Sequence, residues 1–178
     1  MNRRKFLSGL CAGTTLAGTV SLVSNAAAML PALDRDISLV NLHTGEKFRG
    51  QFRTEIGYLD DSLGELNKVL RDHRSGDIHD MDPQLFDWMA SLSGRLGGGE
   101  FSIISGYRSP KTNAALRSKG NGVAKRSWHM QGRAIDLRLD SASTEALRKL
   151  AINDSIGGVG YYPKSNFLHL DTGNARLW

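Results

Sequence analysis

Apolar residues recur three or four positions apart in two stretches of the chain. This spacing places them on one face of a helix, so it predicts amphipathic helices over 58–73 and over 83–96. Asp82 can cap the start of the second helix, and Pro83 suits its first position. The two stripes are Leu59, Leu63, Leu66 and Leu70, and Leu85, Met89, Leu92 and Leu96. Both are most simply explained as core-facing surfaces.

Strand patterns dominate the second half of the chain. The predicted strands are 37–41, 47–51, 101–105, 134–139, 159–162 and 167–171, with shorter helices over 110–118 and 143–152. The first two strands flank a turn over 43–46, a pattern that predicts a hairpin. Because helices come first and strands later, the pattern predicts an α+β fold. We expect one compact domain with a central antiparallel sheet and helices packed on one side of it.

Residues 1–28 have the order of a secretory signal. A basic cluster over 3–5 precedes an apolar run that reaches about Val23, and small residues follow up to Ala28. The paired arginines resemble a twin-arginine export signal. We therefore expect a periplasmic protein of residues 29–178, without stable membrane insertion after cleavage. A membrane anchor is the alternative, although the run barely reaches the ~20 residues that a spanning helix needs.

The charge and the cysteine content narrow the function classes. The net charge is +5, but three of the 23 basic residues lie in the signal segment, which leaves 20 basic against 18 acidic residues. A nucleic-acid-binding protein usually carries a stronger basic stripe, so we expect no nucleic-acid partner. Cys11 is the only cysteine and lies within the signal segment. The remaining chain therefore has no disulfide and no thiol nucleophile. Separately, we expect the mature protein to be a monomer.

Two histidines and one aspartate form a candidate metal site. His129 lies in a loop, whereas Asp136 and His169 lie in predicted strands. A catalytic zinc ion takes three imidazole or carboxylate ligands and keeps one position open. Alternate residues of a strand share a face, so both strands present these side chains opposite their leucines. On the spacing alone the ordinary alternatives stay open: a surface histidine, and an Asp136 paired with Arg138.

The order of these residues resembles a known zinc motif. The pattern is Ser127-x-His129-x-x-Gly132-x-Ala134-x-Asp136. It resembles the first motif of the D-Ala-D-Ala metallopeptidase superfamily, which also holds Hedgehog domains and murein endopeptidases. The segments 105–109 and 167–171 are similar to two further motifs of that superfamily. The patterns over 106–113 and 159–173 are closest to its YcbK/MepK-like branch, whose members also carry a twin-arginine leader.

The resemblance covers residues 35–178 and implies a zinc peptidase domain over 29–178. It implies one zinc ion per chain, bound by His129, Asp136 and His169 in the central sheet.

The resemblance also implies residues that meet the substrate. Arg108 is similar to an arginine that steers a substrate carboxylate or polarises the scissile carbonyl. Ser127, Gln131 and Asn113 would supply hydrogen bonds to the ligands or the substrate. Their alternatives are ordinary loop roles. Trp128 is a weaker candidate that could serve packing alone.

The catalytic base departs from the superfamily pattern. One branch has a glutamate three residues before the last ligand, where this chain has Asn166, and another has a histidine at the position of Phe167. Asp171 is the leading substitute, because it shares a strand face with His169. The alternative is a carboxylate that orients a zinc ligand. His79 is a more distant candidate.

The resemblance implies a peptidoglycan (murein) endopeptidase that hydrolyses D-Ala–diaminopimelate or diaminopimelate–diaminopimelate cross-links. A D,D- or L,D-carboxypeptidase is the near alternative. A catalytically silent zinc module that binds wall peptide belongs to a different class, which the absence of the usual base favours. The complete ligand set and Arg108 favour the enzyme.

Overall fold

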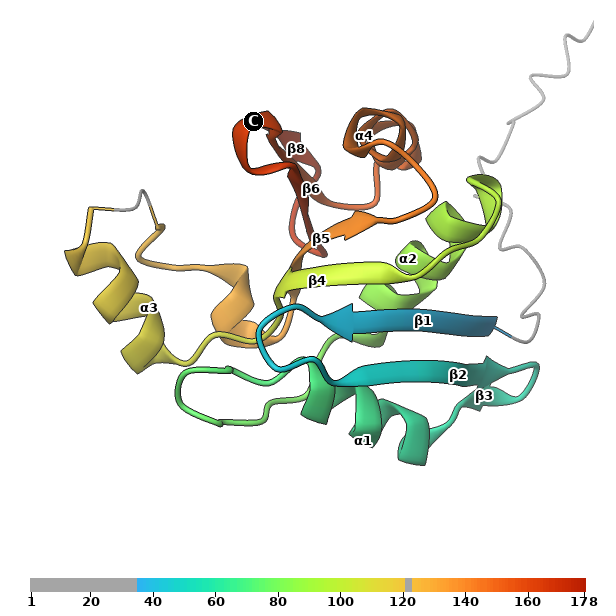
Figure 1. The fold of residues 1–178 in the computed structure, drawn as a ribbon, viewed down its shortest axis with the longest axis horizontal. Coiled ribbons are helices and arrows are strands. Elements are labelled where there is room, and N and C mark those ends of the chain that lie inside the picture. Colours follow the sequence, from blue (N-terminus) through green and yellow to red (C-terminus); the bar gives the residue numbers. More distant parts are fainter. Residues whose placement is uncertain (1–34, 121–122) are drawn as a thin grey trace, which may run out of the picture.

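The computed structural model describes residues 35–120 and 123–178, which form one domain built on a single eight-stranded sheet (Figure 1). The predicted α+β class is therefore confirmed. The predicted signal segment lies outside the described residues. Within the described part of the chain, no helix has both the length and the apolar character needed to cross a membrane.

The elements follow the predicted order closely. The strands are β1 (Arg35–Asn41), β2 (Lys47–Thr54), β3 (Gly57–Tyr58), β4 (Phe101–Ser105), β5 (Ala134–Leu139), β6 (Gly158–Tyr162), β7 (Phe167–Asp171) and β8 (Arg176–Leu177). The helices are α1 (Asp60–Val69), α2 (Pro83–Arg95), α3 (Pro110–Ser118) and α4 (Thr144–Asp154), with short 3₁₀ turns η1 (Trp128–Gln131) and η2 (Pro163–Ser165). The sequence patterns did not predict β3, β8 or the two 3₁₀ turns.

The sheet is mixed, which corrects the expectation of an antiparallel sheet. Its strand order is β3-β2-β1-β4-β5-β7-β6-β8. The pairs β1–β4 and β6–β8 are parallel, and the other described pairs are antiparallel. Between β1 and β4 the chain passes through β2, β3, α1 and α2, a connection long enough to bring it back in the same direction.

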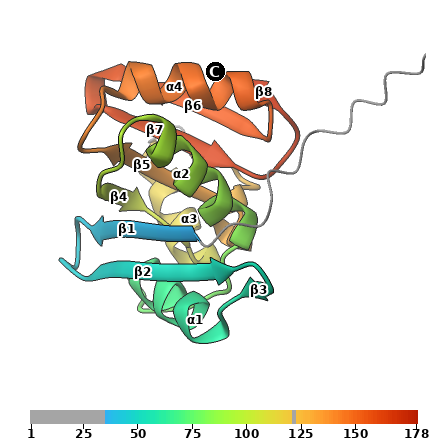
Figure 2. The ribbon, with the colours of Figure 1, turned by 90° about the vertical axis from the view of Figure 1, so that its right-hand side faces the viewer.

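Three helices cover one face of the sheet (Figure 2). α1 packs on β2, α2 packs on β1 and β5, and α4 packs on β5, β6 and β7. The predicted start of α2 is confirmed, because the Asp82 carboxylate accepts a hydrogen bond from the Gln84 N–H. α1 is shorter than predicted. α3 stands apart from this helical layer, beyond the end of β4 (Figure 1).

The strands β5 and β7 present different side chains on their two faces. Leu137 pairs with Leu168 on the face that packs against the helices, and both are fully buried. Asp136 pairs directly with His169 on the opposite face. The alternation predicted from the sequence is therefore present, and the polar side chains share one face of neighbouring strands.

Candidate metal centre

The three predicted ligands converge on one point. His169 Nδ1 lies 2.8 Å from Asp136 Oδ1, because β5 and β7 place the two residues opposite each other. His129 comes from η1, and its Nε2 lies 3.3 Å from both of these atoms. All three residues are buried, with at most 9% of their surface exposed. One donor atom from each residue lies within 4.8 Å of the others, as expected for ligands of a single ion.

Each imidazole is anchored by its other nitrogen. His129 Nδ1 lies 2.7 Å from the carbonyl oxygen of Gly106, and His169 Nε2 lies 2.9 Å from Asp171 Oδ2. With a metal ion bound at His129 Nε2 and His169 Nδ1, the anchored nitrogens would carry the ring protons, because both of their partners accept hydrogen bonds. The two nitrogens that would bind the metal face the common point. Metal-binding histidines are usually held in this way.

The turn that carries His129 depends on its flanking residues. The Ser127 hydroxyl accepts a hydrogen bond from the His129 N–H and caps η1. Gly132 ends the turn with a φ of +65°, in the left-handed region that favours glycine. A Cβ there would also overlap the backbone oxygen of Asp80. Gly132 therefore lets the chain turn between His129 and Asp136.

The residues present fit a zinc ion. Tetrahedral zinc with bonds of ~2.0–2.1 Å to nitrogen and oxygen places neighbouring donor atoms ~3.3 Å apart. The observed separations of 2.8, 3.3 and 3.3 Å lie close to that value. Three protein ligands also leave one tetrahedral position open, which is typical of catalytic rather than structural zinc sites.

The electrostatics of the cluster favour a bound cation. Burial opposes ionisation of Asp136, but His129 and His169 lower its pKa below the ordinary range. Burial also acts to lower the pKa of His169, whereas Asp136 and Asp171 raise it overall. The cluster thus holds ionised carboxylate next to ring nitrogens, an arrangement in which positive charge is stabilised.

Asp171 lies behind His169 rather than in the open site. It is fully buried, and both of its oxygens are occupied. Oδ1 accepts from the Gly173 N–H and Arg176 Nη1, and Oδ2 accepts from His169 Nε2 and Arg176 Nη2. Burial would raise the pKa of Asp171, but His169 and Arg176 lower it to about 2. This placement favours the orienting role over the role of base.

Arg108 presents a buried, weakly bonded cation to the cluster. Its side chain is 11% exposed, and Nη2 lies 3.8 Å from Asp136 Oδ2. Its hydrogen bonds to Ser105 and Asn113 are long, at 3.3 and 3.5 Å, and its buried Nε has no partner among the described residues. Burial lowers the pKa of Arg108 and Asp136 opposes this effect, while an arginine stays charged at neutral pH.

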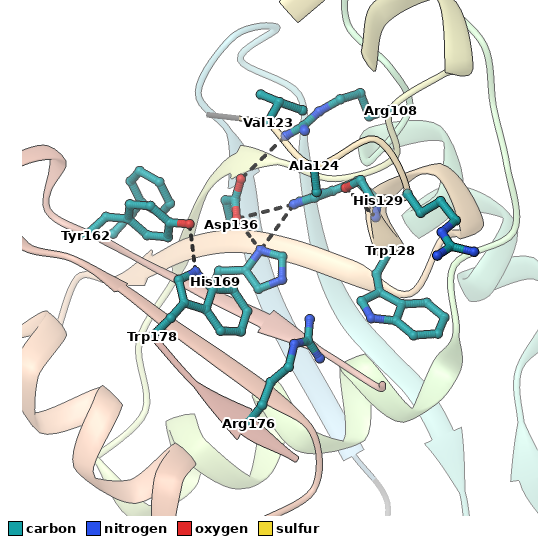
Figure 3. Close-up of a pocket in the computed structure, with 13 residues that line it drawn as sticks. Arg108, Val123, Ala124, Trp128, His129, Asp136, Tyr162, His169, Arg176 and Trp178 are labelled. Atoms are coloured by element: carbon teal, nitrogen blue, oxygen red, sulfur yellow. Dashed lines mark hydrogen bonds and ion pairs between the residues drawn. The ribbon is translucent and has the colours of Figure 1, made fainter. Parts of the chain in front are cut away.

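A cavity of about 720 Å³ opens over the cluster (Figure 3). It is lined by Arg108, Val123, Ala124, Arg126, Ser127, Trp128, His129, Asp136, Tyr162, Phe167, His169, Arg176 and Trp178. Figure 3 shows Trp128 and Trp178 on opposite sides of the ligands. The cavity has the size and the mixed polar and aromatic lining of a site for a small substrate or a peptide segment.

The other predicted residues are distributed unevenly around the cavity. Ser127 lines it. Asn113 is buried behind Arg108 and donates to the Ala124 carbonyl, so it supports the site from outside. Gln131 is exposed on η1 and is not among the described lining residues. His79 is also exposed, and its ring packs on Tyr107 outside the cavity.

Sequence reasoning missed several residues that line the cavity. Tyr162 comes from β6, Arg176 comes from β8, and Trp178 follows β8. The family-like pattern over 159–173 includes Tyr162 but gave it no role. No sequence signal pointed to Arg176, because its contact with Asp171 depends on how the chain turns after β7.

An α+β domain that brings two imidazoles and one carboxylate together beneath an arginine-lined cavity has the composition of a mononuclear metallohydrolase. Comparison with known proteins gives the family. The chain belongs to the family described as Peptidoglycan L,D-endopeptidase MepK, whose family model matches residues 30–178.

Curated relatives agree with this assignment. The Peptidoglycan L,D-endopeptidase MepK of Escherichia coli strain K12 is 42% identical over 178 residues, covering 99% of this chain and 97% of the relative. The corresponding protein of Shigella flexneri has the same identity and coverage. The Probable peptidoglycan L,D-endopeptidase MepK of Haemophilus influenzae is 38% identical over 180 residues, covering 99% and 95%. The resemblance drawn from the sequence motifs is therefore confirmed.

Proposed function

We propose that this protein is a zinc-dependent periplasmic endopeptidase that hydrolyses amide cross-links between peptidoglycan stem peptides. The observation that carries the proposal is that one nitrogen of each imidazole is anchored by a protein oxygen, so that the other nitrogen of each ring and the Asp136 carboxylate face one point. Family membership and relatives described as peptidoglycan L,D-endopeptidases support the same substrate.

The L,D designation of the relatives favours one of the two expected cross-links. An amide between two diaminopimelate residues joins the carboxyl of an L-centre to the amine of a D-centre. The D-Ala–diaminopimelate amide joins two D-centres instead. We therefore propose the diaminopimelate–diaminopimelate cross-link as the main substrate.

The chemistry divides between the metal and the side chains around it. Zinc bound by His129, Asp136 and His169 would act as a Lewis acid toward the amide carbonyl and would make a water molecule more acidic. Arg108 lines the same cavity, and the hydrogen bonds of its Nη atoms to the protein are long. It can therefore donate to the carbonyl oxygen as negative charge develops there, which usually lowers the barrier strongly.

In this proposal Asp171 orients a metal ligand and does not act as the base. Its hydrogen bond to His169 Nε2 fixes the tautomer and orientation of that ligand. Asp136, His129 and His169 are the only carboxylate or imidazole side chains among the described lining residues. Activation of the attacking water is thus assigned to the metal site itself.

We also propose that residues 1–28 direct twin-arginine export and are removed, and that the mature protein is a monomer. The basic pair, the apolar run and the small residues before position 29 support export. Replacing Arg3 and Arg4 together by lysine should leave uncleaved precursor in the cytoplasmic fraction. Equal export of this variant and the parent chain would contradict the proposal.

Digestion of purified sacculi tests the enzymatic proposal. The protein without its signal segment should contain about one zinc per chain and release muropeptides whose masses correspond to cut diaminopimelate–diaminopimelate bonds. A chelator should stop the release and added zinc should restore it. Loss of a single terminal residue would indicate a carboxypeptidase, and binding without product would indicate a silent module. Cleavage that is insensitive to chelator would contradict the metal-dependent mechanism.

A further inference from the structure

A second arginine faces the ligand cluster from the side opposite Arg108. In Figure 3 the guanidinium of Arg176 points toward His169 from below, and Arg108 lies above Asp136. Both arginines line the cavity, where Asp136 is the only Asp or Glu side chain among the described lining residues. Arginine side chains therefore lie on two sides of the metal ligands.

Arg176 is held in a fixed orientation with one edge left open. Its Nη1 and Nη2 donate to Asp171 at 3.0 and 2.7 Å, and Nη1 also donates to the Asn174 carbonyl at 3.1 Å. A guanidinium has five N–H donors, so these contacts leave the Nε–H and one Nη2–H. These two donors share one edge, and neither has a partner among the described residues. The side chain is 41% exposed.

Trp178 packs against both Arg176 and the metal ligand His169. The guanidinium carbon of Arg176 lies 4.8 Å from the centre of the indole ring, and the same ring lies 5.2 Å from the ring of His169. The indole Nε1–H donates to the Tyr162 hydroxyl at 2.9 Å. The ring also packs so closely on Gly160 that a Cβ there would overlap it. These contacts fix the position of Arg176 relative to the metal ligand His169.

We propose that Arg176 binds a free carboxylate of the cross-link and makes the protein selective for diaminopimelate residues that are not amidated. This inference rests on the proposed function. The open edge of Arg176 offers two parallel N–H groups, which match the two oxygens of a carboxylate. A cross-link between two diaminopimelates carries one free carboxylate beside the amide nitrogen and another at the far centre of the other residue. The two arginines on opposite sides of the metal centre can each bind one of these two carboxylates.

Synthetic cross-linked peptides provide the test. One peptide keeps both carboxylates, and two others have one or the other converted to an amide. For the parent protein, one of the two amidations should lower kcat/KM roughly ten- to hundredfold, mainly through KM. Arg176→Gln should lose a similar factor on the unmodified peptide and show no further loss on that amidated peptide. Amidation penalties in Arg176→Gln as large as those in the parent protein would overturn the inference.

Two variants separate carboxylate binding from indirect effects on the ligand. Asp171→Asn weakens the support of His169, so it should lower cleavage of all three peptides. It also removes the partner that orients Arg176, so it should reduce the penalty of amidation as well. If Arg176→Gln instead lowers cleavage of all three peptides in the same ratio, Arg176 acts only through Asp171 and the inference is wrong. Arg148→Gln is the matched control. Its guanidinium also lies over an aromatic ring, 5.1 Å from the centre of Tyr161, but it is not among the described cavity residues, and its kinetics should equal those of the parent.

The kinetics of the parent protein distinguish failure of this inference from failure of the proposed function. If it cleaves the unmodified and both amidated peptides equally well, the carboxylate inference fails while the endopeptidase function stands. If the zinc-loaded parent cleaves none of them, the proposed substrate is wrong and the inference falls with it.

Discussion

The two faces of β5 and β7 are almost equally buried, yet they are stabilised by different interactions. On the face toward the helices, Ile135 and Leu137 of β5 and Leu168 and Leu170 of β7 are fully buried among apolar side chains. Each hydrocarbon side chain there contributes to stability through the surface that it removes from water, at roughly 25 cal/mol per Å². This face needs only shape and apolar character.

On the opposite face, Asp136, His169 and Asp171 are 8, 9 and 0% exposed. Burying such groups costs free energy unless each finds a partner, and each of them is hydrogen-bonded. The comparison shows that burial has opposite consequences on the two faces. The helix-covered face drives folding, whereas the polar face uses that stability to hold charged groups where a metal can bind.

Removing a ligand should give the largest functional effect with little change in folding. His129→Ala deletes one metal donor on the polar face, so we expect zinc binding to be lost and kcat/KM to fall by at least roughly 10³-fold. The metal-free variant should unfold at nearly the same temperature as the metal-free parent. Metal analysis, muropeptide release and calorimetry measure the three quantities. His79→Ala, which changes an exposed histidine outside the cavity, should behave like the parent.

A cavity on the helix-covered side should give the reverse result. Phe86 is fully buried on α2 and meets Phe52 of β2 edge to face, with ring centres 6.0 Å apart. Phe86→Ala should lower the free energy of unfolding by about 3–5 kcal/mol, measured by denaturant titration of metal-free protein. The folded fraction should still bind zinc and cleave. Ile56→Ala, at a 99% exposed position, is the control. Loss of metal affinity in folded Phe86→Ala would show that the two faces are not independent.

Asp171→Asn distinguishes the two roles considered for this residue. An orienting carboxylate supports zinc binding through His169, so its neutral replacement should weaken zinc affinity about 10–100-fold. A base would instead leave affinity unchanged and reduce the rate. A zinc competition assay gives the affinity, and kcat at saturating zinc gives the rate. Unchanged affinity together with a large loss of kcat would restore the role of base to Asp171.

The alternation of apolar and polar residues was sufficient to predict the two faces. In β5 and β7 it placed Asp136 and His169 on one side and the leucines on the other, and the register of the strands confirms this. The start of α2 was also predictable, because the interaction of Asp82 with the first turn is local. Periodicity and capping act within a few residues, so a single sequence shows them.

Features that depend on distant segments could not be predicted. The parallel pairing of β1 with β4 is set by where α1 and α2 pack. The anchor of His129 is a backbone carbonyl, Gly106, and every residue has one. The interaction of Arg176 with Asp171 depends on β8, a strand of two residues without a pattern of its own.

Asp72 is another buried carboxylate whose partners include a distant segment of the chain. Its replacement should give the smallest of the predicted effects. It is 1% exposed and accepts hydrogen bonds from the backbone N–H groups of Arg74 and Ser109, both at 2.9 Å. The second of these bonds fixes the residue next to Arg108 and thereby supports the polar site. Burial opposes ionisation of Asp72, but bonds from Thr112, Arg74 and Ser109 lower its pKa below the ordinary range.

A carboxyl group whose pKa is lower in the folded state than in the unfolded chain stabilises the fold at pH values above its unfolded-state pKa of about 4. This stabilisation is lost as the pH falls. Asp72→Asn should therefore lower the stability of metal-free protein by about 1–2 kcal/mol at pH 7. The difference from the parent should shrink on acidification below about pH 4. Denaturant titrations at pH 7 and below about pH 4 measure this difference in the free energy of unfolding. Asp77→Asn, at an exposed position, is the control. A difference that stays constant with pH would show that the charge of Asp72 does not stabilise this segment, and that only its shape and hydrogen bonding do.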